Sequence, residues 1–150
     1  MPVNAVNFSL DGRLLGTAGA DNAARIWVLG GADIQLVHTL RGHSSVVWDV
    51  VFSPDATAVA TIGFDGAVKL WDVAAGVERM TLPGAGNNGR EVAFSPDGVY
   101  LAVTTGSGLV RLYVLPIDDL LVLAQSRVTR SLSDAECRQY LHLEQCEPDR

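Results

Sequence analysis

Residues 3–113 repeat one pattern three times, and this repetition constrains the fold more than any other feature of the chain. The copies align at offsets of 44 and then 42 residues, which bring three sets into register: Phe8, Phe52 and Phe94; Asp11, Asp55 and Asp97; and Trp27, Trp71 and Tyr113. A period of this length is typical of architectures in which each copy forms one small unit and neighbouring copies bury its hydrophobic faces. We therefore expect three similar units in a row.

Each copy is expected to form short antiparallel strands, because apolar and polar residues alternate over runs that turn residues separate. In the middle copy these runs span residues 46–52, 58–62, 67–72 and 77–82. Ser53-Pro54-Asp55 and Phe64-Asp65-Gly66 predict tight turns between them. The first copy has a similar set that ends in 36–40, whereas the third has only the runs 90–94, 100–104 and 109–114 before Pro116.

The composition permits a buried core and argues against a nucleic-acid-binding protein. Of the 150 residues, 48% are hydrophobic, and the net charge is −6, whereas phosphate recognition requires a clustered positive surface. No run reaches the roughly 18 apolar residues of a membrane helix, and the first residues lack the form of a signal peptide. The expected compartment is therefore the cytoplasm, where Cys137 and Cys146 would stay reduced.

The middle copy, which runs from Gly42-His43 to Trp71-Asp72, resembles the WD40 repeat family. The resemblance implies an all-β fold, a partial WD40-type β-propeller of three four-stranded antiparallel blades in which the third blade lacks its outer strand. The expected blades span about 3–42, 43–84 and 85–115 within a domain of residues 1–115. Residues 116–150 are expected to form a short C-terminal helical tail, in which Ser133 and Glu136 form a capping box that predicts a helix over 134–142.

The resemblance also implies a buried polar relay within a blade. The matching residues are His43, Thr61, Asp65 and Trp71 in the middle copy and Thr17, Asp21 and Trp27 in the first. The third copy has Val103, Ser107 and Tyr113 at these positions, so we expect it to lack the relay. Thr61, His43 and Asp65 could alternatively be taken for a catalytic set, but the family pattern assigns them to the blade interior. We therefore expect a structural role for them.

One column of residues offers candidates for partner binding. Asn4, Trp48 and Arg90 occupy equivalent places early in the innermost expected strands, and the family resemblance implies that these places lie near the top face and the channel mouth. Trp and Arg are enriched at binding hot spots. Two alternatives remain open: Trp48 packs between blades, and Arg90 forms a solvated ion pair with Glu91.

No cofactor and no metal are expected. The only lysine, Lys69, lies inside an expected strand and no phosphate-binding loop precedes it. Cys137, His142, Glu144 and Cys146 are residue types that bind zinc, but their spacing matches no established zinc site.

The predicted function is that of a non-catalytic scaffold that binds a protein partner of unknown identity. Residues 120–146 resemble the segment that closes many bacterial WD40 proteins, which implies the C-terminal part of the regulatory or sensor propeller of a bacterial signalling protein. Alternatives are a propeller-based enzyme, either a hydrolase or a metal-dependent one, and a nonfunctional gene fragment. Because propellers typically contain 4 to 8 blades, we expect either a fragment of a longer protein or a homodimer that closes a six-bladed ring.

Overall fold

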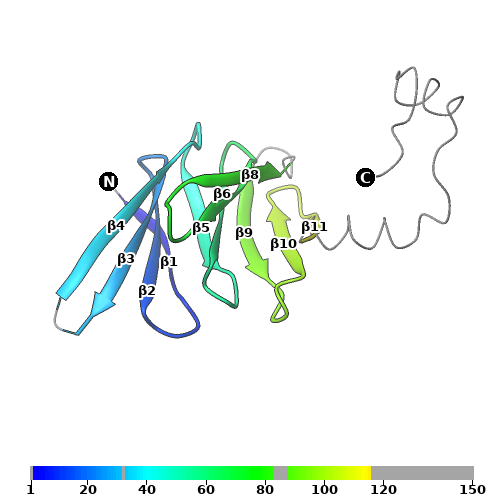
Figure 1. Ribbon diagram of the computed structural model, residues 1–150. Coiled ribbons are helices and arrows are strands. Elements are labelled where there is room, and N and C mark those ends of the chain that lie inside the picture. Colours follow the sequence, from blue (N-terminus) through cyan, green and yellow to red (C-terminus); the bar gives the residue numbers. More distant parts are fainter. Residues whose placement is uncertain (1, 32, 83–87, 116–150) are drawn as a thin grey trace, which may run out of the picture. The chain divides into compact units, whose positions relative to one another are not determined.

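The described structure is all-β, as the sequence predicts. The computed structural model describes residues 2–31, 33–82 and 88–115 (Figure 1), and the regular elements within them are strands β1 to β11. The expected helix over 134–142 and the zinc-competent residues near it lie outside these ranges.

The strands form three antiparallel sheets, one for each repeat, and in each sheet the strands follow the order of the sequence. The first sheet contains β1 (Val3–Phe8), β2 (Leu14–Gly19), β3 (Ala23–Gly30) and β4 (Asp33–Arg41). The second contains β5 (Val47–Phe52), β6 (Ala58–Gly63), β7 (Val68–Asp72) and β8 (Glu78–Leu82). Within the described residues the third contains β9 (Gly89–Phe94), β10 (Tyr100–Thr105) and β11 (Val110–Val114).

The observed strands begin and end within about a residue of the predicted ones, except for β4. This strand starts at Asp33 rather than near residue 36, because β3 continues to Gly30. The two strands stay paired as far as Gly30, which lies opposite Asp33. A register shift between Ile26 and Trp27 accompanies this long hairpin. The side chains at the start of β4 are exposed, so they carry no apolar alternation from which the strand could be predicted.

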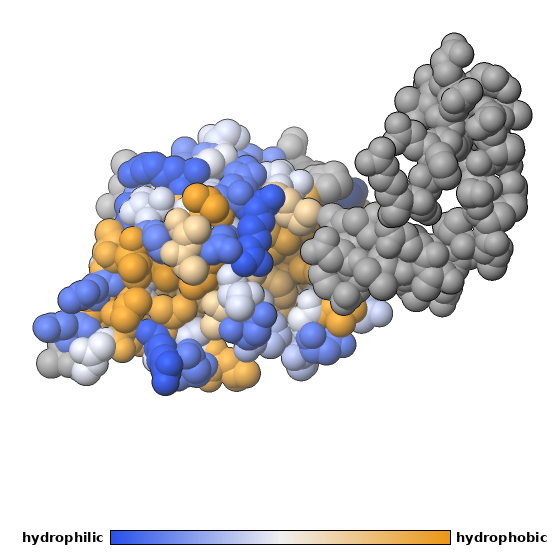
Figure 2. Space-filling view, in the orientation of Figure 1, coloured by the Kyte–Doolittle hydropathy of each residue, from blue (hydrophilic) through white to orange (hydrophobic). Residues whose placement is uncertain are grey.

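The hydrophobic core lies where one sheet packs on the next. A first cluster joins Ile26 and Leu40 of the first sheet to Val50 and Phe52 of the second, and a further cluster joins residues of the second and third sheets, among them Ile62, Leu70, Val92 and Leu101. Apolar side chains also gather on the surface over the first sheet in the view of Figure 2. Each sheet therefore packs face to face on the sheet formed by the adjacent repeat.

The aligned aspartates of the repeats close equivalent turns. In the second sheet Asp55 accepts hydrogen bonds from the Ser53 hydroxyl at 2.6 Å and from the Thr57 amide at 3.0 Å. These two bonds, with the Ser53 bond as the larger cause, lower the pKa of Asp55. The same arrangement recurs in the first and third sheets, in Ser9–Asp11 and Ser95–Asp97.

Candidate partner-binding groove

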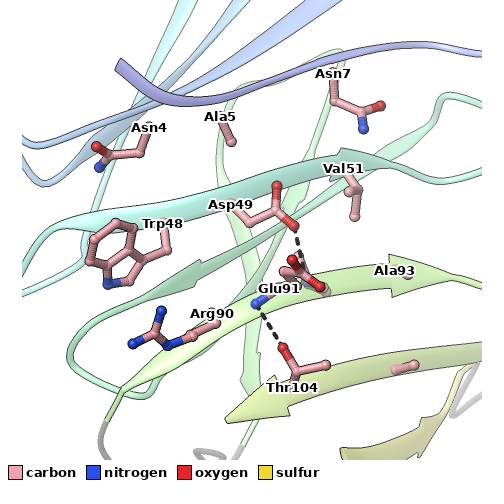
Figure 3. A pocket seen from close by; sticks show the side chains of 12 residues that line it. Asn4, Ala5, Asn7, Trp48, Asp49, Val51, Arg90, Glu91, Ala93 and Thr104 are labelled. Carbon is pink, nitrogen blue, oxygen red and sulfur yellow. Dashed lines mark hydrogen bonds between the residues drawn. The ribbon is translucent and has the colours of Figure 1, made fainter. Parts of the chain in front are cut away.

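A groove of about 590 Å³ runs along the innermost strands β1, β5 and β9 (Figure 3). We call it the inner groove, and its lining residues include Asn4, Trp48, Asp49, Arg90, Glu91 and Thr104. The structure therefore brings all three predicted binding residues, one from each sheet, to the same surface.

Each of the three predicted binding residues is the extra residue of a β-bulge. Strand β2 pairs with Val3 and Ala5 but not with Asn4, and the same shift in the second sheet leaves Trp48 between Val47 and Asp49. In the third sheet β10 pairs with Gly89 and Glu91, and Arg90 is left between them. A bulge redirects the side chain of its unpaired residue, and bulges occur often next to functional sites.

The three side chains differ in how far they are already engaged. Trp48 is 39% exposed, so it is not sealed between two sheets. Arg90 is exposed and forms no ion pair with Glu91 in the part of the chain that the structure describes. Asn4 instead donates a hydrogen bond from Nδ2 to the carbonyl of Val47 at 2.8 Å, and this bond ties β1 to β5.

Asp49 is a residue of the groove that sequence reasoning missed. Its carboxylate accepts hydrogen bonds from the amide of Val50 at 2.8 Å and from the amide of Val92 at 3.0 Å, so it links the second sheet to the third. The equivalent residues of the other two repeats are Ala5 and Glu91, so the three positions share no chemical property that the alignment could reveal. Beside it the amide of Glu91 donates to the Thr104 hydroxyl at 3.1 Å.

The predicted polar relay residues of the second sheet are joined by hydrogen bonds. Trp71 donates from Nε1 to the Thr61 hydroxyl at 2.9 Å. The same hydroxyl lies 2.8 Å from Nε2 of His43, and Nδ1 of His43 lies 3.1 Å from Asp65. Since the indole only donates and the carboxylate only accepts, a consistent assignment has Thr61 donating to Nε2 and His43 donating from Nδ1.

The surroundings of His43 favour its neutral form. Burial is the largest cause and lowers the pKa of His43 below its ordinary value of 6.5, although Asp65 opposes the shift. Protonation at Nε2 would also remove the acceptor of the Thr61 hydroxyl. Burial raises the pKa of Asp65, but hydrogen bonds from the Ser44 and Ala67 amides and from His43 outweigh it, so the pKa is lowered.

Close packing around this relay requires a glycine. A Cβ added to Gly63 would lie 2.5 Å from a carboxylate oxygen of Asp65 and 2.6 Å from Nδ1 of His43, both well below a normal contact. The turn after β6 can therefore approach the imidazole only because residue 63 lacks a side chain.

The other two sheets contain only parts of this arrangement. In the first sheet Trp27 donates to Thr17 at 3.1 Å, while Asp21 forms a charged hydrogen-bonded pair with Arg25. That pair lowers the pKa of Asp21. In the third sheet Thr105 and Ser107 share a hydrogen bond of 2.7 Å between their hydroxyls.

The geometry gives the catalytic alternative no route to a substrate. Thr61 is fully buried, and its hydroxyl is bonded to both His43 and Trp71. A nucleophile must reach the atom that it attacks. In the described ranges no group of three or more His, Cys, Asp or Glu residues is placed to hold a metal ion. Nor does any helix in those ranges have the length and apolar character needed to cross a membrane.

Comparison with known proteins agrees with this architecture. The family model described as "WD domain, G-beta repeat" matches residues 1–28 and 34–72, which belong to the first two sheets. A WD repeat-containing protein WDS homolog from Arabidopsis thaliana is 43% identical over 100 residues, which cover 64% of this chain and 19% of that protein.

Two further relatives show the same partial coverage. Eukaryotic translation initiation factor 3 subunit I from Scheffersomyces stipitis is 40% identical over 93 residues, covering 62% of this chain and 26% of the relative. Small ribosomal subunit protein RACK1 from Caenorhabditis elegans is 34% identical over 109 residues, covering 71% of this chain and 33% of the relative. The chain thus spans a third or less of each of these proteins. Over the matched residues the chain is therefore similar to proteins of the WD40 repeat family, and the three consecutive antiparallel sheets agree with that similarity.

Proposed function

We propose that this chain is a non-catalytic protein-interaction module that binds a segment of a partner protein in the inner groove. The observation that carries the proposal is the coincidence of three β-bulges with three groove residues, Asn4, Trp48 and Arg90. One bulge would be a local irregularity, whereas a bulge in every innermost strand gives the surface a side chain from each sheet.

The chemistry of the groove indicates what the partner supplies. Trp48 offers a half-buried aromatic ring against which an apolar or aromatic side chain can pack. Arg90 offers a planar guanidinium that suits a carboxylate, which it can bind through two parallel hydrogen bonds. Asn4 and Asp49 each bond one sheet to the next, so we assign them to the support of the groove.

The polar relay supports the fold in this proposal. A buried imidazole, hydroxyl and indole are each costly without a partner, and the relay satisfies them together. We therefore propose that His43 and Thr61 contribute to stability and take no part in chemistry.

We further propose that the chain is the C-terminal part of the regulatory or sensor propeller of a bacterial signalling protein, located in the cytoplasm. The support for this proposal is the resemblance of residues 120–146 to the ends of bacterial WD40 proteins. The relatives compared above are eukaryotic, and two of them are named as a subunit of a translation initiation factor and as a small ribosomal subunit protein. The proposal also includes a homodimer of two three-bladed chains, because six blades lie within the typical range.

A displayed peptide library selected on the purified chain tests groove binding. We expect enriched peptides that combine an aromatic or large apolar residue with Asp or Glu. Their affinity should fall about tenfold or more for Trp48→Ala and for Arg90→Ala, because truncation of a hot-spot residue costs about 2 kcal/mol or more. Val77→Ala is the matched control, since Val77 is an exposed apolar residue in the turn of the second sheet between β7 and β8.

Two results would overturn the groove assignment. One is the enrichment of peptides that bind Trp48→Ala and Arg90→Ala as tightly as the original chain. The other is an equal loss of affinity in Val77→Ala, which would place the binding surface elsewhere.

A further inference from the structure

The face by which the second sheet packs on the first is built from three apolar residues. Val47, Val50 and Phe52 are almost fully buried in this contact. Their equivalents in the first sheet are Val3, Val6 and Phe8, which are 62%, 62% and 60% exposed. We call these three residues the leading face. The same side-chain types are thus buried where a preceding sheet is present and exposed where the described chain has none.

The leading side of each following sheet packs on the opposite side of the sheet before it. Ala18, Ala24 and Ile26 of the first sheet and Ile62, Val68 and Leu70 of the second are buried in this role. Their equivalents in the third sheet are Thr104, Val110 and Leu112, of which Val110 is 68% and Leu112 63% exposed. We call these three residues the trailing face.

The leading and trailing faces are therefore the two halves of an interface that the chain already forms twice within itself. We propose that two copies of the chain associate head to tail, with the leading face of each copy on the trailing face of the other. This inference rests on the homodimer in the proposed function and identifies its surface. Two copies give six blades, within the typical range of 4 to 8, whereas three copies would give nine.

A polar contact accompanies each internal junction and suggests one for the junction between copies. Asn4 bonds the Val47 carbonyl at the first junction, and Asp49 bonds the Val92 amide at the second. Glu91 stands in the column of Asp49, and Val6 stands in the column of Val92. The carboxylate of Glu91, which is exposed, is thereby expected to accept a hydrogen bond from the Val6 amide of the second copy.

Light scattering on purified chains tests the inference, because a head-to-tail contact uses different faces on the two partners. Phe8→Glu changes only the leading face and Leu112→Glu only the trailing face, and the exposure of both residues makes each change tolerable in the single chain. The dimerisation affinity of each variant alone should be lower by on the order of tenfold or more, because each junction then buries a glutamate against apolar side chains. An equimolar mixture should regain part of the association, since one junction of a mixed dimer carries no substitution and the other carries both. Val77→Glu, in the turn between β7 and β8, is the control, which should form dimers as well as the original chain does.

The outcomes separate this inference from the functions on which it rests. A dimer that both variants leave intact would overturn the proposed faces but leave the homodimer standing. Weaker dimers in only one of the two variants would mean that the leading and trailing faces do not contact each other, and this result would also overturn the head-to-tail arrangement. A monomeric original chain at micromolar to millimolar concentration would overturn both the faces and the homodimer, while peptide binding in the inner groove would be judged by its own experiment.

Discussion

The second and third sheets share a backbone pattern but differ in what lies at equivalent positions inside them. In the second sheet Thr61 and Trp71 belong to a hydrogen-bonded polar relay with His43. In the third sheet the same places in the strand pairing are taken by Val103 and Tyr113. Val103 is buried in the hydrophobic cluster between the two sheets, just as Thr61 is fully buried in its own sheet.

Strand pairing and the polar relay therefore contribute separately to the structure of a sheet. The third sheet keeps its turn, its pairing and its contact with the second sheet without a relay. The relay is therefore not needed to define a sheet of this kind, and its value should lie in the stability of the sheet that contains it. The first sheet is intermediate, because it keeps the bond between Trp27 and Thr17 but pairs Asp21 with Arg25.

The largest effect is expected from Thr61→Val, which gives the second sheet the residue type found in the third. The substitution leaves the Trp71 indole and Nε2 of His43 buried without their partner, so the free energy of unfolding should fall by about 2–4 kcal/mol. Thr17→Val, which removes one bond from a less buried site, should cost about 0.5–1 kcal/mol. Urea denaturation of both variants measures the difference. Equal losses would mean that the relay adds nothing beyond a single hydrogen bond.

A second effect is expected from His43→Ala, which removes the middle of the relay. We expect the free energy of unfolding to fall by about 1–3 kcal/mol while the affinity for groove peptides is kept, because His43 lies outside the inner groove. Thermal melts and peptide titrations on the same sample measure both quantities. An unchanged melting temperature would contradict the structural role of the relay.

The protonation of His43 should make stability depend on pH. Because the pKa of His43 is lowered in the folded chain, the unfolded chain takes up the proton first as the pH falls below about 6.5, and stability declines there. His43→Gln should remove this part of the decline. The comparison of urea midpoints at several pH values between 7.5 and 5 tests the sign. A stability that rises over this interval, or an identical slope in His43→Gln, would count against a buried neutral imidazole.

The smallest change in the free energy of unfolding is expected at the turns that follow the innermost strands. Gly12, Ala56 and Gly98 occupy equivalent positions with φ of 69°, 58° and 73°, a left-handed conformation that costs alanine energy. Ala56→Gly should therefore raise the free energy of unfolding by about 0.5–1 kcal/mol, and Gly12→Ala should lower it by a similar amount. Gly12 is the suitable control because an added Cβ would meet nothing within 4 Å. The same sign for both substitutions would show that packing, rather than backbone conformation, decides the effect.

Much of the fold could be predicted because its signals are local and repeated. The turn aspartates and the alternating strands appear three times in register, so each copy supports the reading of the others. The length of β4 could not be predicted, since its first residues are exposed and pair only with the end of β3. Residues 116–150, where the helix was predicted, lie outside the described ranges.

The candidate site was predicted in part. The alignment of repeats brought Asn4, Trp48 and Arg90 together, but it gave no sign that each is the extra residue of a bulge. A bulge depends on pairing with the next strand, which alternation within one strand does not reveal. Asp49 was missed for a related reason, because its bond to the Val92 amide joins two sheets through a contact 43 residues apart in sequence.

The state of His43 is the most direct test of this account. A long-range ¹H–¹⁵N spectrum of the histidine side chains at pH 7, with His43→Gln used for assignment, reports the charge and the tautomer. The account predicts a neutral ring with its proton on Nδ1, which donates to Asp65 and leaves Nε2 to accept from Thr61. A protonated ring, or a neutral ring with its proton on Nε2, would contradict the relay as described.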